Sequence, residues 1–108
     1  MTFSQYQEES KKTSIYPQAS GLVYTALGLA GEAGEVANKV KKIIRDKNGV
    51  LDDETKADIA DELGDTLWYV SNLASELGVK LDNIVAQNLA KLFSRRDRGT
   101  LAGSGDKR

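Results

Sequence analysis

The stretch GLVYTALGLAGEAGEVANKVKKIIR, residues 21–45, decides the fold. Apolar side chains recur in it every three or four residues, which is the spacing of one face of an α-helix. These side chains are Leu22, Ala26, Leu29, Ala33, Val36, Val40 and Ile43. A long helix with one apolar stripe has to bury that stripe against another element. The stretch therefore predicts an amphipathic helix that faces the core of the protein.

A second helix of the same kind follows after a short turn. The turn residues DKNG, 46–49, interrupt the first pattern, Asp52 or Asp53 can cap the next helix, and Gly78 can end it. The apolar face of this helix carries Ile59, Leu63, Leu67, Val70, Ala74 and Leu77. Because the connection is short, the two helices are expected to form an antiparallel hairpin.

Two shorter helices flank the hairpin. The first is expected over about residues 2–12, capped by Thr2 or Ser4, and it ends before Pro17. The other is expected over about residues 81–96, and its inward side chains would be Ile84, Val85, Leu89 and Leu92. No segment alternates apolar and polar residues as a strand does. We therefore expect an all-α fold, in which a four-helix bundle-like subunit is built on a central antiparallel hairpin.

Length and composition limit the possible functions. The 108 residues allow one domain, which we place at 1–98, followed by a polar, glycine-containing tail at 99–108. A domain of this size has little room for a large cleft, so a nucleotide-sized ligand would lie between subunits of an oligomer. The net charge of −1 argues against binding to a nucleic acid backbone. Neither a signal peptide nor a membrane span is visible, so we expect a cytoplasmic protein with no membrane partner.

The chain contains no cysteine and no histidine. Disulfides, thiolate or imidazole metal ligands, and cysteine or histidine catalysis are therefore excluded. Carboxylates remain as the main groups that could carry out chemistry.

The two hairpin helices repeat one acidic pattern. EAGE at 32–35 and ELGD at 62–65 both place acids three residues apart on one helical face, at the edge of the apolar stripe. When the stripes pack together, Glu32, Glu35, Glu62 and Asp65 can converge. Four close carboxylates repel one another unless a cation neutralises them, and oxygen ligands suit Mg²⁺ or Mn²⁺. The pattern therefore favours a site for phosphate chemistry.

Either acid pair alone is typical of a solvated surface, and Lys39 lies four residues after Glu35 as an ordinary ion-pair partner. The repeated pattern and the helical glycines at 28, 31, 34 and 64 argue for the metal site. Each such glycine costs about 1 kcal/mol relative to alanine. That cost is understandable where a backbone or a ligand approaches closely.

These motifs resemble those of a known family. GLAGEAGEV at 28–36 followed by ELGD at 62–65 is similar to the E-x-x-E and E-x-x-D signature of MazG-like nucleotide pyrophosphohydrolases, within the all-α NTP pyrophosphatase superfamily. The resemblance extends from Tyr6 to Leu101. It implies Mg²⁺-dependent hydrolysis of a (deoxy)nucleoside triphosphate to the monophosphate and pyrophosphate, by a homodimer or homotetramer. Some members carry a further acid where this chain has Gly31, so the number of ions stays open.

Carried over by position, the resemblance implies that Glu32, Glu35, Glu62 and Asp65 are the metal ligands. For the activation of the attacking water we select Glu35 as the catalytic residue. The expected biological role is housekeeping of the nucleotide pool. The alternative is a helical oligomerisation or regulatory module that keeps the same fold without turnover.

Other side chains are candidates for contact with the substrate. Asn88, Lys91 and Arg95 form a polar line along the last helix and could meet a triphosphate or a base edge, although a solvated face is the alternative. Trp68 could stack on a nucleobase or pack in the core. Lys39 could neutralise phosphate charge or remain an ordinary surface residue.

Overall fold

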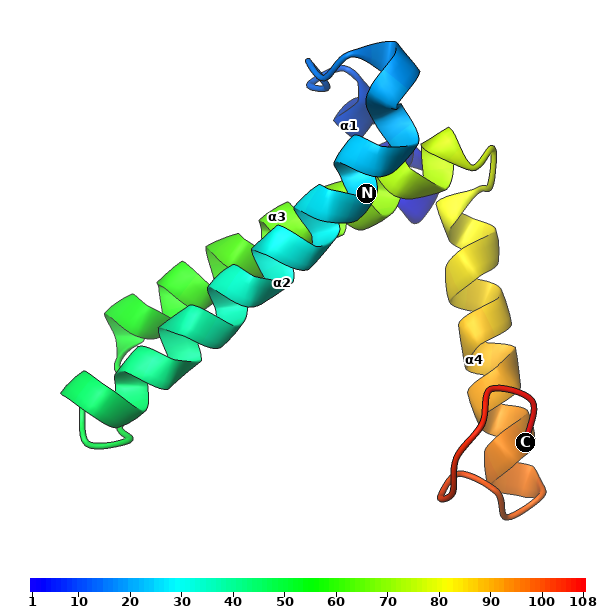
Figure 1. Cartoon of the computed structure of the whole chain (residues 1–108). Helices are drawn as coiled ribbons and strands as arrows, with labels where there is room; N and C mark the ends of the chain where they lie inside the picture. Colours follow the sequence, from blue (N-terminus) through cyan, green and yellow to red (C-terminus); the bar gives the residue numbers. More distant parts are fainter.

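The computed structural model of the chain describes residues 1–108 and contains four α-helices, one short 3₁₀-helix and no strands. The helices are α1 (Phe3–Lys11), α2 (Gly21–Asp46), α3 (Asp53–Glu76) and α4 (Leu81–Asp97), and the 3₁₀-helix η1 (Gln18–Ser20) leads directly into α2. Figure 1 shows that α2 and α3 run side by side, whereas α4 points away from them. The predicted all-α class is confirmed, and the helix bounds agree with the predicted ones to within about one residue.

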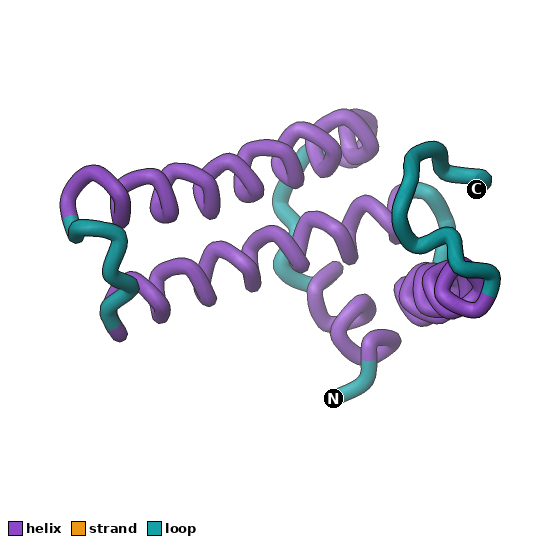
Figure 2. Tube along the Cα trace, turned by 90° about the horizontal axis from the view of Figure 1, so that it is seen from below, coloured by secondary structure: helices purple, strands orange, loops and turns teal.

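The antiparallel hairpin of α2 and α3 is the central element, as the sequence predicts (Figure 2). Its turn is made by Asn48 and Gly49, whose φ angles of 53° and 76° lie in the left-handed region that favours these two residue types. Asp52 caps α3, because its carboxylate accepts a hydrogen bond from the Thr55 amide at 2.8 Å. Ile43 is buried close to the turn end of the hairpin.

Helix α1 is attached to the other end of the hairpin by buried polar groups. Thr2 and Gln5 form a capping box that starts α1. Gln7 donates hydrogen bonds to the Ser75 hydroxyl and the Val79 carbonyl, and its carbonyl oxygen accepts one from the Leu81 amide at 2.8 Å. One side chain therefore connects α1, α3 and the start of α4.

Helix α4 does not join a bundle with the other helices of the chain, and this corrects the expected four-helix arrangement. It contacts α1 and α3 near its beginning and has no contact with α2. Leu89 and Leu92, expected to point inward, are 52% and 37% exposed. The radius of gyration is 16.8 Å, against about 13 Å for a compact domain of this length. The Gln7 contacts fix the direction of α4 only at its base.

Residues 99–108 form no helix, as expected, but they fold back onto the end of α4. The Arg95 guanidinium donates a hydrogen bond to the Asp106 carbonyl at 2.6 Å. Arg108 donates to the carbonyls of Thr100, Leu101 and Gly105. The tail is thus held by arginine side chains and backbone oxygens. None of the helices combines the length and the apolar character that crossing a membrane would require.

Candidate metal centre

Three of the four predicted acids meet across the hairpin. Glu32 comes from α2, and Glu62 and Asp65 come from successive turns of α3. One carboxylate oxygen from each of these residues lies within 4.8 Å of the other two. Glu35 is exposed and lies one turn further along α2, beside this group of three and outside it. Helical spacing and hairpin packing therefore create the acid cluster, defined here as Glu32, Glu62 and Asp65.

The acid cluster has an unfavourable balance of charge. The pKa of Glu32 is raised, first by its partial burial and then by its hydrogen bond to the Glu62 carboxyl and by the negative charges of Asp65, Glu62 and Glu35. Lys39 Nζ lies 3.6 Å from Glu62 Oε1 and is the one cation in a salt bridge with the cluster. Lys39 therefore pairs with an acid of the other helix and not with Glu35 on its own helix.

The donor set fits a hard divalent cation. All three groups offer carboxylate oxygens, which are the ligands that Mg²⁺ and Mn²⁺ prefer. A single lysine cannot neutralise three carboxylates. A divalent ion would offset the repulsion that, after burial, contributes to the raised pKa of Glu32. The cluster lies at the surface of the hairpin, so several coordination positions would stay available to water and phosphate oxygens.

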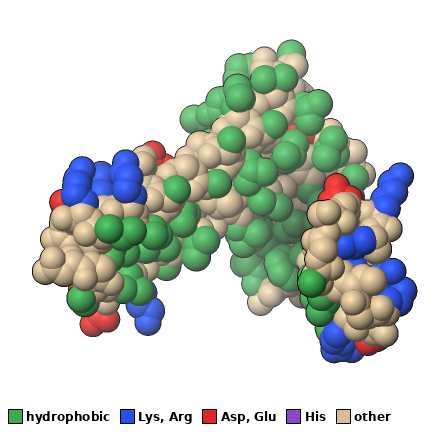
Figure 3. Space-filling view, turned by 60° about the horizontal axis from the view of Figure 1, so that its bottom comes forward, with side chains coloured by type: hydrophobic (Ala, Val, Ile, Leu, Met, Phe, Trp, Pro, Cys, Tyr) green, Lys and Arg blue, Asp and Glu red, His purple; other side chains and the backbone are tan.

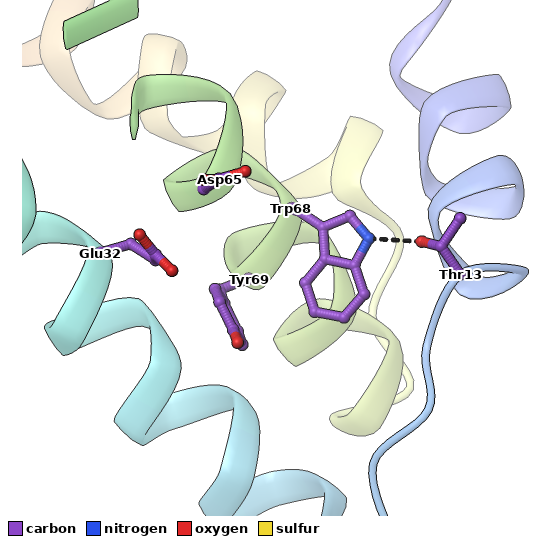
Figure 4. A pocket seen from close by; sticks show the side chains of 5 residues that line it. All are labelled: Thr13, Glu32, Asp65, Trp68 and Tyr69. Atoms are coloured by element: carbon purple, nitrogen blue, oxygen red, sulfur yellow. Dashed lines mark hydrogen bonds between the residues drawn. The ribbon is translucent and has the colours of Figure 1, made fainter. Parts of the chain in front are cut away.

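A cavity of about 310 Å³ opens beside the acid cluster, lined by Thr13, Glu32, Asp65, Trp68 and Tyr69 (Figure 4). The Trp68 Nε1 donates a hydrogen bond to Thr13 Oγ1 at 2.7 Å, and this hydroxyl donates to the Ser10 carbonyl at 2.8 Å. The rings of Trp68 and Tyr69 meet edge to face, with their centroids 5.0 Å apart. Trp68 is therefore fixed at the wall of a cavity that also contains two of the acids.

Sequence reasoning missed the role of Thr13. This residue follows α1 and belongs to no motif, and it reaches the cavity only because α1 packs against α3. A single sequence gives no local signal for a contact between residues so far apart.

The helical glycines differ in what surrounds them. A Cβ atom added at Gly28 would overlap the ring of Tyr69, so this glycine allows the close approach that the sequence suggested. Gly31, Gly34 and Gly64 have no atom within 4 Å of such a Cβ position. The helix backbone at these three glycines, beside the acids, is therefore uncovered.

The three predicted residues of α4 lie apart from the acids. Asn88 and Lys91 line a separate pocket on α4 itself, together with Ile84 and Gln87. Arg95 is only 5% exposed because the tail covers it. The fold thus brings Trp68 and Lys39 to the acid cluster. It leaves Asn88, Lys91 and Arg95 on α4, which does not touch α2.

Comparison with known proteins identifies the class to which this fold and site belong. A family model described as "MazG nucleotide pyrophosphohydrolase domain" matches residues 23–100, which include both acidic motifs. The chain belongs to this family. It is also 52% identical over 109 residues to the "Gene 37 protein" of Mycobacterium phage L5, and the alignment covers 95% of this chain and 96% of that protein. No solved structure matches the chain significantly.

Proposed function

We propose that the protein is a Mg²⁺-dependent nucleoside triphosphate pyrophosphohydrolase, which converts (deoxy)nucleoside triphosphates to monophosphates and pyrophosphate. The observation that carries this proposal is the convergence of Glu32, Glu62 and Asp65 to within 4.8 Å, beside a cavity with an aromatic wall. Membership of the pyrophosphohydrolase family supports the choice of reaction. Housekeeping of the nucleotide pool is the biological role that we assign to it.

In this proposal, Glu32, Glu62 and Asp65 hold the metal, and Glu35 belongs to the same set of ligands. A bound Mg²⁺ supplies positive charge near the phosphoryl oxygens, where negative charge is spread during phosphoryl transfer. Mn²⁺ has the same preference for oxygen ligands and is expected to substitute for Mg²⁺.

The remaining steps are assigned to side chains of the chain itself. Water attacks the α phosphorus, and the bond from this phosphorus to the oxygen that bridges to the β phosphorus breaks, so that pyrophosphate leaves. Glu35 accepts the proton of the attacking water, because its carboxylate lies next to the acid cluster. Lys39 forms its salt bridge with Glu62, so Glu35 is not paired with Lys39. Lys39 can turn from Glu62 towards a phosphate, and Trp68 presents its ring to the nucleobase.

We further propose that the active form is a homodimer or homotetramer. Only three hydrophobic side chains are buried in the chain, namely Ile43, Ala74 and Leu81, while many large ones are exposed. Exposed apolar surface of this extent is typical of an assembly interface. Light scattering at micromolar concentration is expected to give at least a dimer mass, and a monomer mass would contradict the proposal.

The proposed activity is tested by measuring pyrophosphate release from a panel of ribonucleoside and deoxyribonucleoside triphosphates. We expect release with Mg²⁺, loss of release with a chelator, and recovery when excess Mg²⁺ is added back. Glu62→Gln is the matched inactive control, because it keeps the side-chain shape and removes one charge. A correctly folded protein that releases no pyrophosphate from any nucleotide would favour the non-catalytic module.

A further inference from the structure

A second cavity lies where α1 and the segment that follows it meet the end of α3. Its volume is about 450 Å³, which is within the range of sites for small molecules. Hydrophobic side chains cover much of the hairpin surface in Figure 3, whereas six of the seven residues that line this cavity are polar or charged. We call it the polar cavity, and its lining residues include Lys11, Ser14, Tyr16, Asn72, Ser75 and Glu76.

The polar cavity adjoins the cavity beside the acid cluster. Thr13 lines the cavity of the acids, and the next residue, Ser14, lines the polar cavity. The rings of Trp68 and Tyr16, one from each cavity, meet edge to face with their centroids 6.4 Å apart. A single ligand can therefore extend from the acids past these rings into the polar cavity.

The spacing of the two cavities suits a nucleotide. Asn72 follows Asp65 by seven residues, so both lie on one face of α3 and about 10 Å apart along its axis. A nucleotide spans a similar distance from its α phosphate to the far edge of its base. Phosphates held at the acid cluster would thus place the edge of the base at Asn72.

Asn72 is a buried side chain with a free acceptor. It is 1% exposed, and its Nδ2 donates a hydrogen bond to the Trp68 carbonyl at 3.0 Å. Because a carbonyl oxygen can only accept, this bond fixes the orientation of the amide and leaves Oδ1 as the free group. No group of the chain donates to Oδ1. A buried acceptor without a donor is unfavourable, so a ligand that supplies a donor would be bound preferentially.

The other polar groups at this end of α3 also favour donors on the ligand. The Glu76 carboxylate accepts a hydrogen bond from the Tyr16 hydroxyl at 2.8 Å and has further acceptor positions. The Ser75 hydroxyl is already bonded as a donor and as an acceptor. Lys11 pairs with Glu8 on its own helix. The groups of α3 that remain free to meet a ligand are therefore an amide oxygen and a carboxylate.

Nucleobases differ in whether they present a donor at the matching position. Adenine, cytosine and guanine carry an exocyclic amino group, which donates hydrogen bonds. Uracil and thymine carry a carbonyl oxygen where cytosine has its amino group. That oxygen would face the two acceptors of α3 without a hydrogen between them, and a buried acceptor would stay unpaired.

We infer that the edge of the substrate's base lies in the polar cavity, and that Asn72 selects bases with an exocyclic amino group, whose N–H donates to its Oδ1. Glu76 adds a second acceptor that disfavours a base carbonyl. Residues 12–17 form no helix and contact α3 through Thr13 and Tyr16, and this segment shifts to admit the base to the buried amide. The inference rests on the proposed function, and it adds which nucleotides are the substrates.

Substrate pairs that differ at this one position test the inference. The kcat/KM for CTP is expected to exceed that for UTP by at least about tenfold, and the same order is expected for dCTP and dUTP. Asn72→Leu keeps the approximate size of the side chain and removes the acceptor, so the ratio of CTP to UTP should fall at least about fivefold. Asn83→Leu is the matched control, because Asn83 is exposed on α4 and lines no cavity.

A second variant keeps the test decisive if Asn72→Leu does not fold. Glu76 is exposed, so Glu76→Gln is expected to fold, and the new amide can donate to a base carbonyl. UTP should therefore gain kcat/KM relative to CTP in this variant. Equal use of CTP and UTP by the wild-type protein would overturn the inference, and so would a ratio that neither variant changes.

Binding without turnover separates this inference from the proposed activity. The α,β-imido analogues of CTP and UTP cannot be cleaved at the bridging position, and calorimetry with Mg²⁺ measures their Kd. The CTP analogue is expected to bind the wild-type protein at least about tenfold more tightly than the UTP analogue, and Asn72→Leu should reduce this difference. This preference in a protein that hydrolyses no nucleotide would support the base site and reject the activity. Hydrolysis of CTP and UTP at equal rates, with equal binding of the analogues, would support the activity and overturn the base site.

Discussion

The ring of Tyr69 lies directly on the backbone of Gly28, where it occupies the space that any larger side chain would need. Gly28 precedes Glu32 by one helical turn on α2, and Tyr69 follows Asp65 by one turn on α3. The contact therefore sets the separation of the two helices next to the residues that bring the acids together.

Replacing Gly28 with alanine is expected to push the helices apart. Overpacking of this kind costs about 1–3 kcal/mol in the free energy of unfolding, and it should also lower activity by displacing Glu32 from Asp65. Gly34→Ala is the matched control, because its Cβ meets no atom within 4 Å and alanine favours a helix by about 0.5–1 kcal/mol. Urea unfolding of both variants measures the difference. Equal stability of the two variants would show that the Tyr69 contact does not limit the packing.

The carboxylates of the acid cluster are expected to bind the metal and to lower the stability of the metal-free protein. Glu32→Gln, Glu62→Gln or Asp65→Asn should lower kcat by at least about 100-fold, since the lost charge helps to hold the ion. In the presence of a chelator the same variants should melt at or above the wild-type temperature, because repulsion within the cluster is relieved. Added Mg²⁺ should raise the Tm of the wild-type protein and not that of the variants. Full activity in any two of them would reject a shared site.

Thr13 is expected to affect substrate binding by holding the ring of Trp68 in place. Thr13→Val keeps the shape of the side chain and removes the acceptor of the indole N–H, a bond worth about 1 kcal/mol. If Trp68 contacts the nucleobase, KM should rise by roughly fivefold while kcat changes little. Thr13→Ser retains the hydroxyl and should behave like the wild type. If Thr13→Val alters the tryptophan fluorescence but leaves KM unchanged, Trp68 has a packing role and does not contact the nucleobase.

Tyr16 is expected to make the free energy of unfolding depend on pH in the alkaline range. Burial, together with its hydrogen bond to Glu76 at 2.8 Å and the negative charge of Glu76, raises the pKa of Tyr16 from 10.0 to about 12. The folded protein thus holds the phenolic proton more tightly than the unfolded chain does. The contribution of the Tyr16 hydroxyl to the free energy of unfolding is complete below pH 10 and is lost as the pH rises towards 12. The stability difference between wild type and Tyr16→Phe should therefore shrink over this range, and a constant difference would contradict the assignment.

How far the sequence predicts the structure depends on how local each feature is. The helices, the Asp52 cap and the hairpin follow from spacing and turn residues within each segment, and the structure confirms them. The direction of α4 could not be predicted, because it is set by hydrogen bonds of Gln7 to residues 68–74 positions away in the chain. The cavity could not be predicted for the same reason, since Thr13 contacts Trp68 across 55 positions of the chain.

The acid motifs do predict that carboxylates meet, because helical periodicity fixes the face on which each acid lies. The position of Glu35 outside the acid cluster could not be predicted, because it depends on how α2 packs against α3.

In the proposed reaction, the site catalyses attack of water on the α phosphorus of a nucleoside triphosphate. Hydrolysis in ¹⁸O-labelled water with Mg²⁺, followed by mass spectrometry of both products, tests it most directly, with Glu62→Gln as the inactive control. Attack at the α phosphorus puts one labelled oxygen in the nucleoside monophosphate and none in the pyrophosphate. Label in the pyrophosphate would mean attack at the β phosphorus, and orthophosphate as the first product would mean attack at the γ phosphorus. Either result would contradict hydrolysis at the α phosphorus.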